Sequence, residues 1–205
     1  MKNLWNSKKT DQFGKNILKM RVYSSRLLGE NNDLVLYGGG NTSVKLKGKN
    51  FFGDEVEYLL IKGSGVNLST IEAKDFTQLN LKQILKLVEF EDLDDIDLVS
   101  QQRLAMDEPD SLMPSVEAIL HAIIPFEWVD HTHADAIVTI TNTPSGENLI
   151  GEIYGDRVIV IPYSKPGFKL AKNVFKYLKD IDWAKYEGLI LLNHGIFTRK
   201  CICSQ

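Results

Sequence analysis

Residues Pro114 to Asp135 read Pro-Ser-Val-Glu-Ala-Ile-Leu-His-Ala-Ile-Ile-Pro-Phe-Glu-Trp-Val-Asp-His-Thr-His-Ala-Asp. This stretch places His131 and His133 two residues apart, after an apolar run that favours a β-strand. Residues i and i+2 of a strand point to the same face, so both imidazoles can reach one ion. Imidazole nitrogens are ligands that Zn²⁺ binds in tetrahedral sites. The stretch therefore predicts a strand that ends in a metal site.

Two further side chains are candidate ligands of the same ion. Glu117 lies on a predicted helix that Pro114 and Ser115 open, since proline suits the first helical turn. His194 comes much later, where a predicted buried strand runs into a glycine. Three imidazoles and one carboxylate suit a catalytic zinc ion if the carboxylate can leave the metal. A His-x-His pair alone fits ordinary hydrogen-bonded histidines equally well.

The distribution of histidines favours the metal hypothesis. The chain has four histidines, and three of them stand beside Gly, Asp or Thr at predicted strand ends. Strand ends are where α/β sheets place their chemistry. The fourth, His121, follows Glu117 by four residues on the same helical face, and we expect it to be a packed histidine and not a ligand.

Composition indicates an ordinary globular domain. A chain of 205 residues is sufficient for one domain with a full core, and its net charge of −3 gives no reason to expect nucleic acid or an anionic membrane as a partner. No run is apolar enough to span a bilayer, and the first residues lack the apolar core that is typical of a secretory signal. Cys201 and Cys203 cannot form a disulfide framework. A Cys-x-Cys pair can bind metal, but a terminal tail with two thiols is the preferred interpretation. We expect a cytoplasmic protein.

Helical and strand patterns alternate along the chain, which indicates an α/β fold. The predicted helices are Thr10–Leu28, Leu81–Phe90, Leu98–Met106, Ala134–Asn142, Glu147–Tyr154 and Phe168–Lys179. The predicted strands are Leu34–Tyr37, Thr42–Leu46, Val56–Lys62, Phe76–Asn80, Arg157–Pro162, Gly188–Asn193 and one that begins at Ile196–Thr198.

Two loops of small residues follow predicted strands. Three glycines precede Asn41, Thr42 and Ser43, and Lys62 opens the sequence Lys-Gly-Ser-Gly. Bare backbone amides and side-chain donors suit an anion, and phosphate is the expected one. The hydroxyl of Ser115 can join them at a helix N-terminus. Neither loop is a P-loop or a dinucleotide fingerprint, and a glycine-rich hairpin turn is the alternative for the first. Lys62 can add charge or be solvated.

Five motifs, in this order, resemble the class II aldolase/adducin family: Gly39-Gly-Asn-Thr-Ser, Lys62-Gly-Ser-Gly, Pro114-Ser-Val-Glu, His131-Thr-His and Asn193-His-Gly. The resemblance runs from about Ser25 to Thr198. It implies three α/β/α layers around a mixed, mostly antiparallel sheet, and a ring-like homotetramer.

The resemblance also implies site residues in three roles. His131, His133 and His194 would bind Zn²⁺ or another divalent metal, with Glu117 as a fourth ligand and catalytic acid/base. Gly40, Asn41, Ser64, Gly65 and Ser115 would hold a sugar phosphate. A tyrosine of the neighbouring subunit, for which Tyr154 is the candidate, would donate a proton.

Three segments are similar to one branch of the family, the bifunctional rhamnulose-1-phosphate aldolase/alcohol dehydrogenases: Val-Asp-His-Thr-His-Ala-Asp, Ile-Pro-Tyr-Ser-Lys-Pro-Gly-Phe and Leu-Leu-Asn-His-Gly-Ile-Phe-Thr. This branch implies cleavage of a ketose 1-phosphate to dihydroxyacetone phosphate and an aldehyde through a metal-stabilised enediolate. We expect residues 1–205 to form a single domain without the branch's dehydrogenase domain. The tail from Arg199 differs from the family, and we expect either a truncation or a frame change there.

Two other functions stay open. A pentulose-phosphate 4-epimerase uses the same fold, ligands and bond cleavage. A non-catalytic adducin-like module or a truncated remnant is the alternative outside enzymes. A dehydrogenase is disfavoured, because no Gly-x-Gly-x-x-Gly opens a helix.

Overall fold

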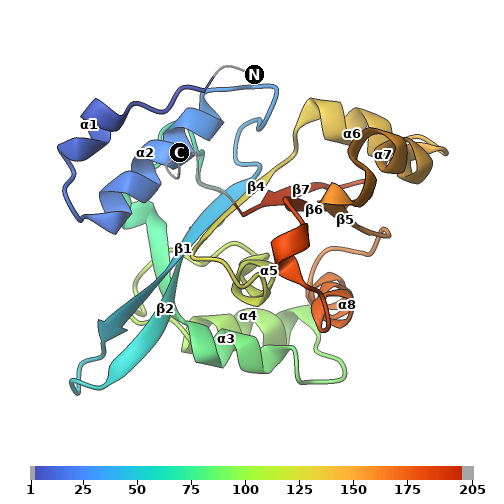
Figure 1. Ribbon diagram of the computed structural model, residues 1–205. Helices are drawn as coiled ribbons and strands as arrows, with labels where there is room; N and C mark the ends of the chain where they lie inside the picture. Colours follow the sequence, from blue (N-terminus) through green and yellow to red (C-terminus); the bar gives the residue numbers. More distant parts are fainter. Residues whose placement is uncertain (1–2, 200–205) are drawn as a thin grey trace.

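A computed structural model describes residues 3–199 (Figure 1). Its helices are α1 (Ser7–Asp11), α2 (Ile17–Gly29), α3 (Leu81–Leu87), α4 (Asp95–Leu104), α5 (Ala118–Ile123), α6 (Asp135–Thr141), α7 (Gly146–Tyr154) and α8 (Phe168–Leu178). Its strands are β1 (Asn41–Lys49), β2 (Glu55–Lys62), β3 (Phe76–Asn80), β4 (Trp128–Thr132), β5 (Val158–Ile161), β6 (Gly188–Leu191) and β7 (Gly195–Thr198). Short 3-10 turns cover Ala73–Asp75, Gly155–Arg157 and Trp183–Lys185.

The strands form one seven-stranded sheet in the order β3-β2-β1-β4-β7-β6-β5. Only β5 and β6 pair in parallel among these strands, and the other five pairings are antiparallel. Strand β4 lies at the centre, between β1 and β7. The expected mixed, mostly antiparallel sheet is confirmed.

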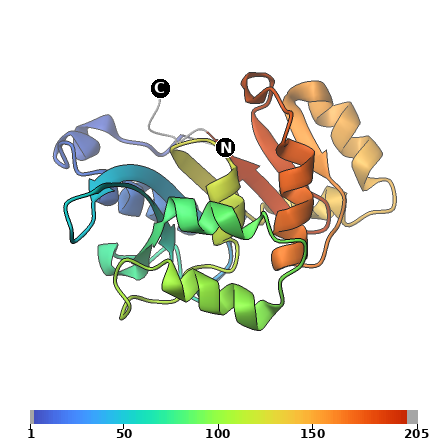
Figure 2. The ribbon, with the colours of Figure 1, turned by 90° about the horizontal axis from the view of Figure 1, so that it is seen from below.

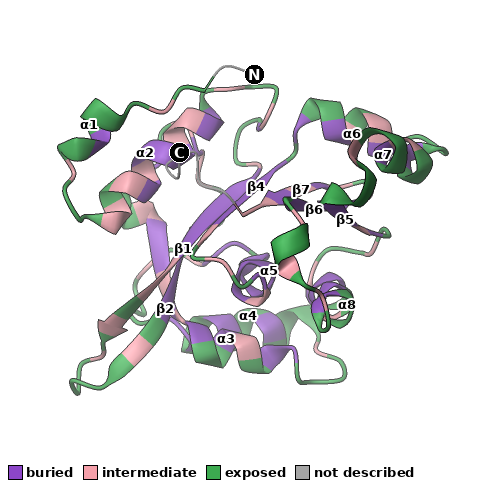
Figure 3. Ribbon diagram, in the orientation of Figure 1, coloured by how far each residue is buried: buried purple, intermediate pink, exposed green. Residues whose placement is uncertain are grey.

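Helices cover both faces of the sheet (Figures 1 and 2). Helices α3, α4, α5 and α8 lie on one face, and α2, α6 and α7 lie on the other. Burial is concentrated where the helices meet the strands (Figure 3). All four residues of β6 are buried, as expected of a strand covered on both sides. The expected three layers are therefore present.

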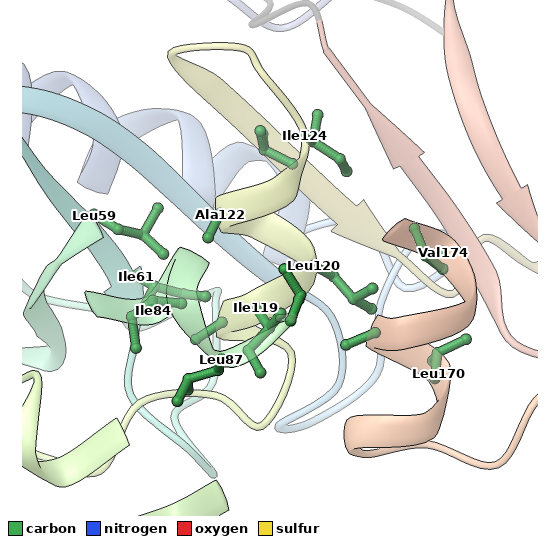
Figure 4. Packing of buried hydrophobic residues seen from close by; sticks show 14 of the residues in the cluster. Leu59, Ile61, Ile84, Leu87, Ile119, Leu120, Ala122, Ile124, Leu170 and Val174 are labelled. Carbon is green, nitrogen blue, oxygen red and sulfur yellow. The ribbon is translucent and has the colours of Figure 1, made fainter. Parts of the chain in front are cut away.

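The larger core cluster joins α5 to its neighbours. Ile119 and Leu120 of α5 pack with Ile84 of α3 and Val174 of α8 (Figure 4). Full burial of each such side chain contributes about 1.5–3 kcal/mol of transfer free energy. This packing anchors a helix of only six residues, which would not persist alone in water.

Three expectations about local structure were wrong. The helix predicted over Thr10–Leu28 is two helices, because Gly14 has a left-handed φ of +55° and the side chain of Asn16 starts α2 by accepting from the Lys19 amide. The strand predicted over Leu34–Tyr37 is a set of turns. Its amides bond locally, Leu34 and Val35 to the Asn31 carbonyl, so no strand partner holds it extended.

The third error concerns the helix that carries Glu117. Pro114 and Ser115 do not open it, because this segment is extended beside the end of β2: Pro114 forms a bridge with Gly63, and the Ser115 amide donates to the Lys62 carbonyl at 3.0 Å. Helix α5 begins at Ala118, and Glu117 is its N-cap residue. The other predicted helices and strands are confirmed, with shifts of a few residues at their ends.

A buried ion pair fastens α2 to the sheet. Arg21 Nη2 lies 2.6 Å from Asp130 Oδ1, with side-chain exposures of 0% and 6%. The guanidinium also donates to the Ser43 carbonyl and to Ser25 Oγ. Asp130 belongs to β4 and points to the α2 face, so His131, the next residue, points to the α5 face.

Within residues 3–199, none of the helices has the length and apolar character that crossing a bilayer requires. Cys201, Cys203 and the rest of the tail after Arg199 lie outside the described residues.

Candidate metal centre

His131 is oriented by its neighbours so that one ring nitrogen faces the other candidate ligands. Its side chain is fully buried, and its ring stacks on Phe197 with centroids 4.2 Å apart. Its Nδ1 donates to the Ile196 carbonyl at 3.1 Å, so its Nε2 carries the lone pair. Burial lowers the pKa of His131 to about 4, which keeps the imidazole neutral. A neutral ring held by a backbone acceptor is what a metal-ligating histidine requires.

Two more imidazoles converge on this nitrogen. His133 follows β4 directly, and its Nε2 lies 3.0 Å from His131 Nε2. His194 lies in the turn between β6 and β7, where the preceding residue, Asn193, has a left-handed φ of 59°. The three residues each offer a nitrogen within 4.8 Å of the others. The cluster can therefore hold a metal ion.

Gly195 lets β7 begin directly against these rings. A Cβ at this position would lie 2.5 Å from the Thr132 carbonyl oxygen and 3.0 Å from His131 Cε1. Neither the Thr132 backbone nor the stacked His131 ring can move far enough to make room for a Cβ, so the site needs glycine at position 195.

Glu117 brings a carboxylate to the three histidines. Its Oε2 lies 3.4 Å from His131 Nε2, and its Oε1 lies 3.1 Å from His194 Nε2. Oε1 is buried and makes no hydrogen bond within the described residues. Burial would raise the pKa of Glu117, but His131, His194 and a hydrogen bond from Asn41 outweigh it and lower that pKa. The carboxylate is therefore ionised, as a metal ligand or a base must be.

These distances match the spacing of metal ligands. Neighbouring ligands of a tetrahedral zinc ion lie about 3.3 Å apart, because zinc–nitrogen bonds are about 2.0–2.1 Å long. The His131–His133, His194–Glu117 and His131–Glu117 separations are 3.0, 3.1 and 3.4 Å, and the nitrogens of the three histidines all lie within 4.8 Å of one another. The donors are three nitrogens and one carboxylate, and one carboxylate oxygen lacks a hydrogen-bond partner among the described residues. The residues fit a divalent metal.

A cavity of about 260 Å³ opens beside the cluster and joins both small-residue loops. Its walls are Gly38, Gly39, Gly40, Asn41, Lys62, Ser64, Gly65, Ser115, Val116, Glu117, His133, Pro166 and His194. The structure thus brings all five expected phosphate-binding residues to the space next to Glu117. Their binding role stays a prediction.

Other candidate residues lie elsewhere. The expectation that Thr42 and Ser43 add donors for phosphate was wrong: Thr42 Oγ1 bonds Ser25 on the α2 face, and Ser43 Oγ bonds His121 Nδ1 in the interior. Tyr154 does not line the cavity of its own chain and instead lies under Arg157, with the guanidinium 5.7 Å from its ring. Its role from a neighbouring subunit stays a prediction.

Lys62 lines the cavity and ties its two loops together. Its ammonium donates to the Gly38 carbonyl at 3.0 Å and to the Val66 carbonyl at 2.7 Å. Burial lowers its pKa to about 8, although the charge of Glu117 opposes that shift. The sequence left its direction open because a lysine at a strand end can turn to either side.

Replacing Lys62 with methionine is expected to weaken binding of inorganic phosphate by about 10–100-fold, since a charge-assisted hydrogen bond is worth about 1.5–3 kcal/mol. The cation is present below pH 8 and lost above it, so phosphate affinity of the unmodified protein should fall between about pH 7 and pH 9.5. Calorimetric titration at both pH values tests this. Lys176→Met, on the exposed side of α8, is the control. Equal phosphate affinity in both variants contradicts the assignment.

The chain belongs to the family of the class II aldolase and adducin N-terminal domain, whose model matches residues 21–200. It is 35% identical over 198 residues to an uncharacterized oxidoreductase of Bacillus subtilis (strain 168), YuxG. That match covers 97% of this chain but 28% of the relative, so the chain spans little more than a quarter of the relative's length.

Solved structures agree with this membership. The N-terminal class II aldolase domain of a conserved protein from Thermoplasma acidophilum is 40% identical, with a TM-score of 0.84 over 97% of this chain and 88% of that one. A sugar-phosphate aldolase from Thermotoga maritima has a TM-score of 0.62 at 14% identity, covering 90% of this chain and 84% of that one. An L-fuculose-1-phosphate aldolase from Thermus thermophilus has a TM-score of 0.52 at 20% identity, covering 89% and 81%. The last two share the fold.

Proposed function

We propose that the protein is a zinc-dependent aldolase that cleaves a ketose 1-phosphate to dihydroxyacetone phosphate and an aldehyde. The observation that carries this proposal is the position of Glu117, which lies between two imidazoles of the three-histidine cluster and also lines the cavity. A carboxylate placed between a metal centre and a substrate space can serve first as a ligand and then as a base.

Each part of the site has a role in this reaction. His131, His133 and His194, with Glu117, would hold the metal, which supplies Lewis-acid stabilisation of the negative charge that develops on the substrate oxygens. Glu117 moves a proton between the substrate and its Oε1. Gly40, Asn41, Ser64, Gly65 and Ser115 hold the phosphate, with the charge of Lys62, and so orient a reacting carbon that is distant from it.

Rhamnulose 1-phosphate is the substrate we propose, with lactaldehyde as the aldehyde. The support is the likeness of three segments to the bifunctional rhamnulose-1-phosphate aldolase/alcohol dehydrogenases. The relative of which the chain spans 28% is named an oxidoreductase, which agrees with a dehydrogenase region in such proteins.

We also propose a cytoplasmic homotetramer in which Tyr154 of a neighbouring subunit donates a proton. Tyr154 ends α7 and is partly buried among α6, α7 and β5, at the opposite end of the sheet from β3.

Two alternatives to the aldolase function remain. One is a pentulose-phosphate 4-epimerase, which cleaves the same kind of bond, and the other is a non-catalytic or truncated remnant.

One set of measurements separates these functions. The purified protein is analysed for metal, sized in solution and incubated with rhamnulose 1-phosphate or ribulose 5-phosphate. Stoichiometric zinc with release of dihydroxyacetone phosphate supports the aldolase. A changed configuration at C4 of the pentulose without cleavage supports the epimerase. Failure to bind added zinc supports the remnant and rejects both enzymes.

A further inference from the structure

We infer that His121 is a positioning residue, which acts through Asn41 to fix the hydrogen-bond donor that faces Glu117. The role of Glu117 in this inference rests on the proposed function. His121 is not a metal-ligand candidate, and packing alone would not require its two nitrogens.

A chain of hydrogen bonds crosses the interior from β1 to the site. His121 is fully buried on α5, its Nδ1 lies 2.7 Å from Ser43 Oγ, and its Nε2 contacts Asn41 Oδ1. The other end of the Asn41 amide donates to Glu117 Oε2 at 2.6 Å and to Ser115 Oγ at 3.1 Å. Asn41 and Ser43 point to the same face of β1, toward α5.

The direction of every bond follows from one fact. An ionised carboxylate only accepts hydrogen bonds, so the Asn41 atom that faces Glu117 is the amide nitrogen. The amide oxygen then faces His121, whose Nε2 must donate the proton. In the neutral ring Nδ1 is left to accept from the Ser43 hydroxyl. The chain of bonds therefore selects a single tautomer of His121.

This arrangement acts on the site through the orientation of one amide. If Asn41 turned over, its oxygen would face the carboxylate of Glu117 and repel it, and two nitrogens would meet at His121. His121 therefore stabilises the orientation in which Asn41 donates to Glu117 and Ser115. A carboxylate held in this way is fixed beside the histidine cluster before any ligand arrives.

Two substitutions separate positioning from packing. His121→Phe keeps an aromatic ring against Phe197, whose centroid lies 5.3 Å from that of His121, but it removes both nitrogens. His121→Gln keeps a donor and an acceptor in a smaller side chain. Ser24→Ala removes an equally buried hydroxyl, which bonds the Arg21 carbonyl within α2 and is not part of the chain from Ser43 to Glu117, and it is the matched control.

Co²⁺ affinity, measured by titration of its visible absorption, is expected to fall about 10–100-fold in His121→Phe. Co²⁺ affinity should recover most of this loss in His121→Gln and change little in Ser24→Ala. Cleavage should follow the same order through kcat, with KM nearly constant. An order that follows side-chain volume, with Gln worse than Phe, overturns the inference.

Nitrogen NMR of the metal-free protein gives a test that needs neither activity nor metal. The His121 ring should show a protonated Nε2 and an unprotonated Nδ1. A proton on Nδ1 alone overturns the inference even if the enzyme is an aldolase. The expected tautomer and Co²⁺ order in a protein that cleaves no ketose phosphate would reject the proposed function and leave this inference intact. The NMR result stands if His121→Phe fails to fold.

Discussion

Glu117→Gln is expected to lower kcat for aldol cleavage by about 10²–10⁴-fold while the protein keeps its metal, because a positioned general acid or base contributes a factor of that size. Glutamine has nearly the volume of glutamate and keeps one oxygen, but it cannot accept the substrate proton. The three histidines remain in place to hold the ion. Steady-state kinetics with zinc analysis of the same sample give the two quantities.

Glu127→Gln is the matched control for this substitution. It makes the same chemical change at an exposed position just before β4, where the Glu127 carboxylate bonds only the neighbouring Trp128 among the contacts described. Its kcat should equal that of the unmodified protein. If Glu117→Gln retained full kcat, Glu117 would not be the base. If it lost both metal and activity, Glu117 would be a ligand that the cluster cannot do without.

His133→Ala is expected to abolish stoichiometric zinc binding and with it the cleavage. Its imidazole is the closest of the cluster to His131, at 3.0 Å between the Nε2 atoms, and its loss leaves two histidines and one carboxylate. Catalytic zinc sites use three protein ligands and a water or substrate, and the carboxylate that remains here is the one that must also release the metal. Because His133 is exposed and lies just after the end of β4, the fold should persist, and the melting temperatures of the two metal-free proteins should differ little.

Zinc analysis after dialysis measures this loss, and circular dichroism checks the fold. Asn173→Ala, an exposed change on α8, should retain zinc. Full zinc occupancy in His133→Ala would contradict its assignment as a ligand.

The sequence predicted most of the sheet because buried strands need apolar side chains, and short apolar runs are visible in the sequence. The runs that became β5 and β6 are apolar, and each strand lies within the range predicted for it. The His-x-His spacing also predicted one shared face, although His133 lies just beyond the end of β4.

Predictions failed where partners decide the local structure. Leu34–Tyr37 has the composition of a strand, yet the Leu34 and Val35 amides bond the carbonyl of Asn31, three and four residues earlier, and not a neighbouring strand. Pro114 and Ser115 have the composition of a helix start, yet the end of β2 holds them extended. In the second segment a contact distant in sequence outweighs the helical preference of the residues. In the first, a strand-like composition is not enough without a neighbouring strand to pair with.

The interior hydrogen bonds were beyond prediction for a related reason. His121 and Asn41 are separated by 80 positions, and only the packing of α5 on β1 brings them together. The sequence predicted a packed His121 but gave no sign of its partners. The direction in which the Lys62 side chain points was likewise unpredictable, because it is set by two loop carbonyls that accept from its ammonium group.

The alternation of Asp130 and His131 along β4 protects the fold against misalignment. A slip of β4 by one residue would bring the aspartate among the imidazoles and leave Arg21 facing a ring that cannot neutralise it. Both faces of β4 would then carry mismatched contacts, and the unpaired buried charge of Arg21 alone would cost several kcal/mol. Two neighbouring residues of opposite orientation thus specify the register of β4, and with it the single alignment in which the other strands can assemble.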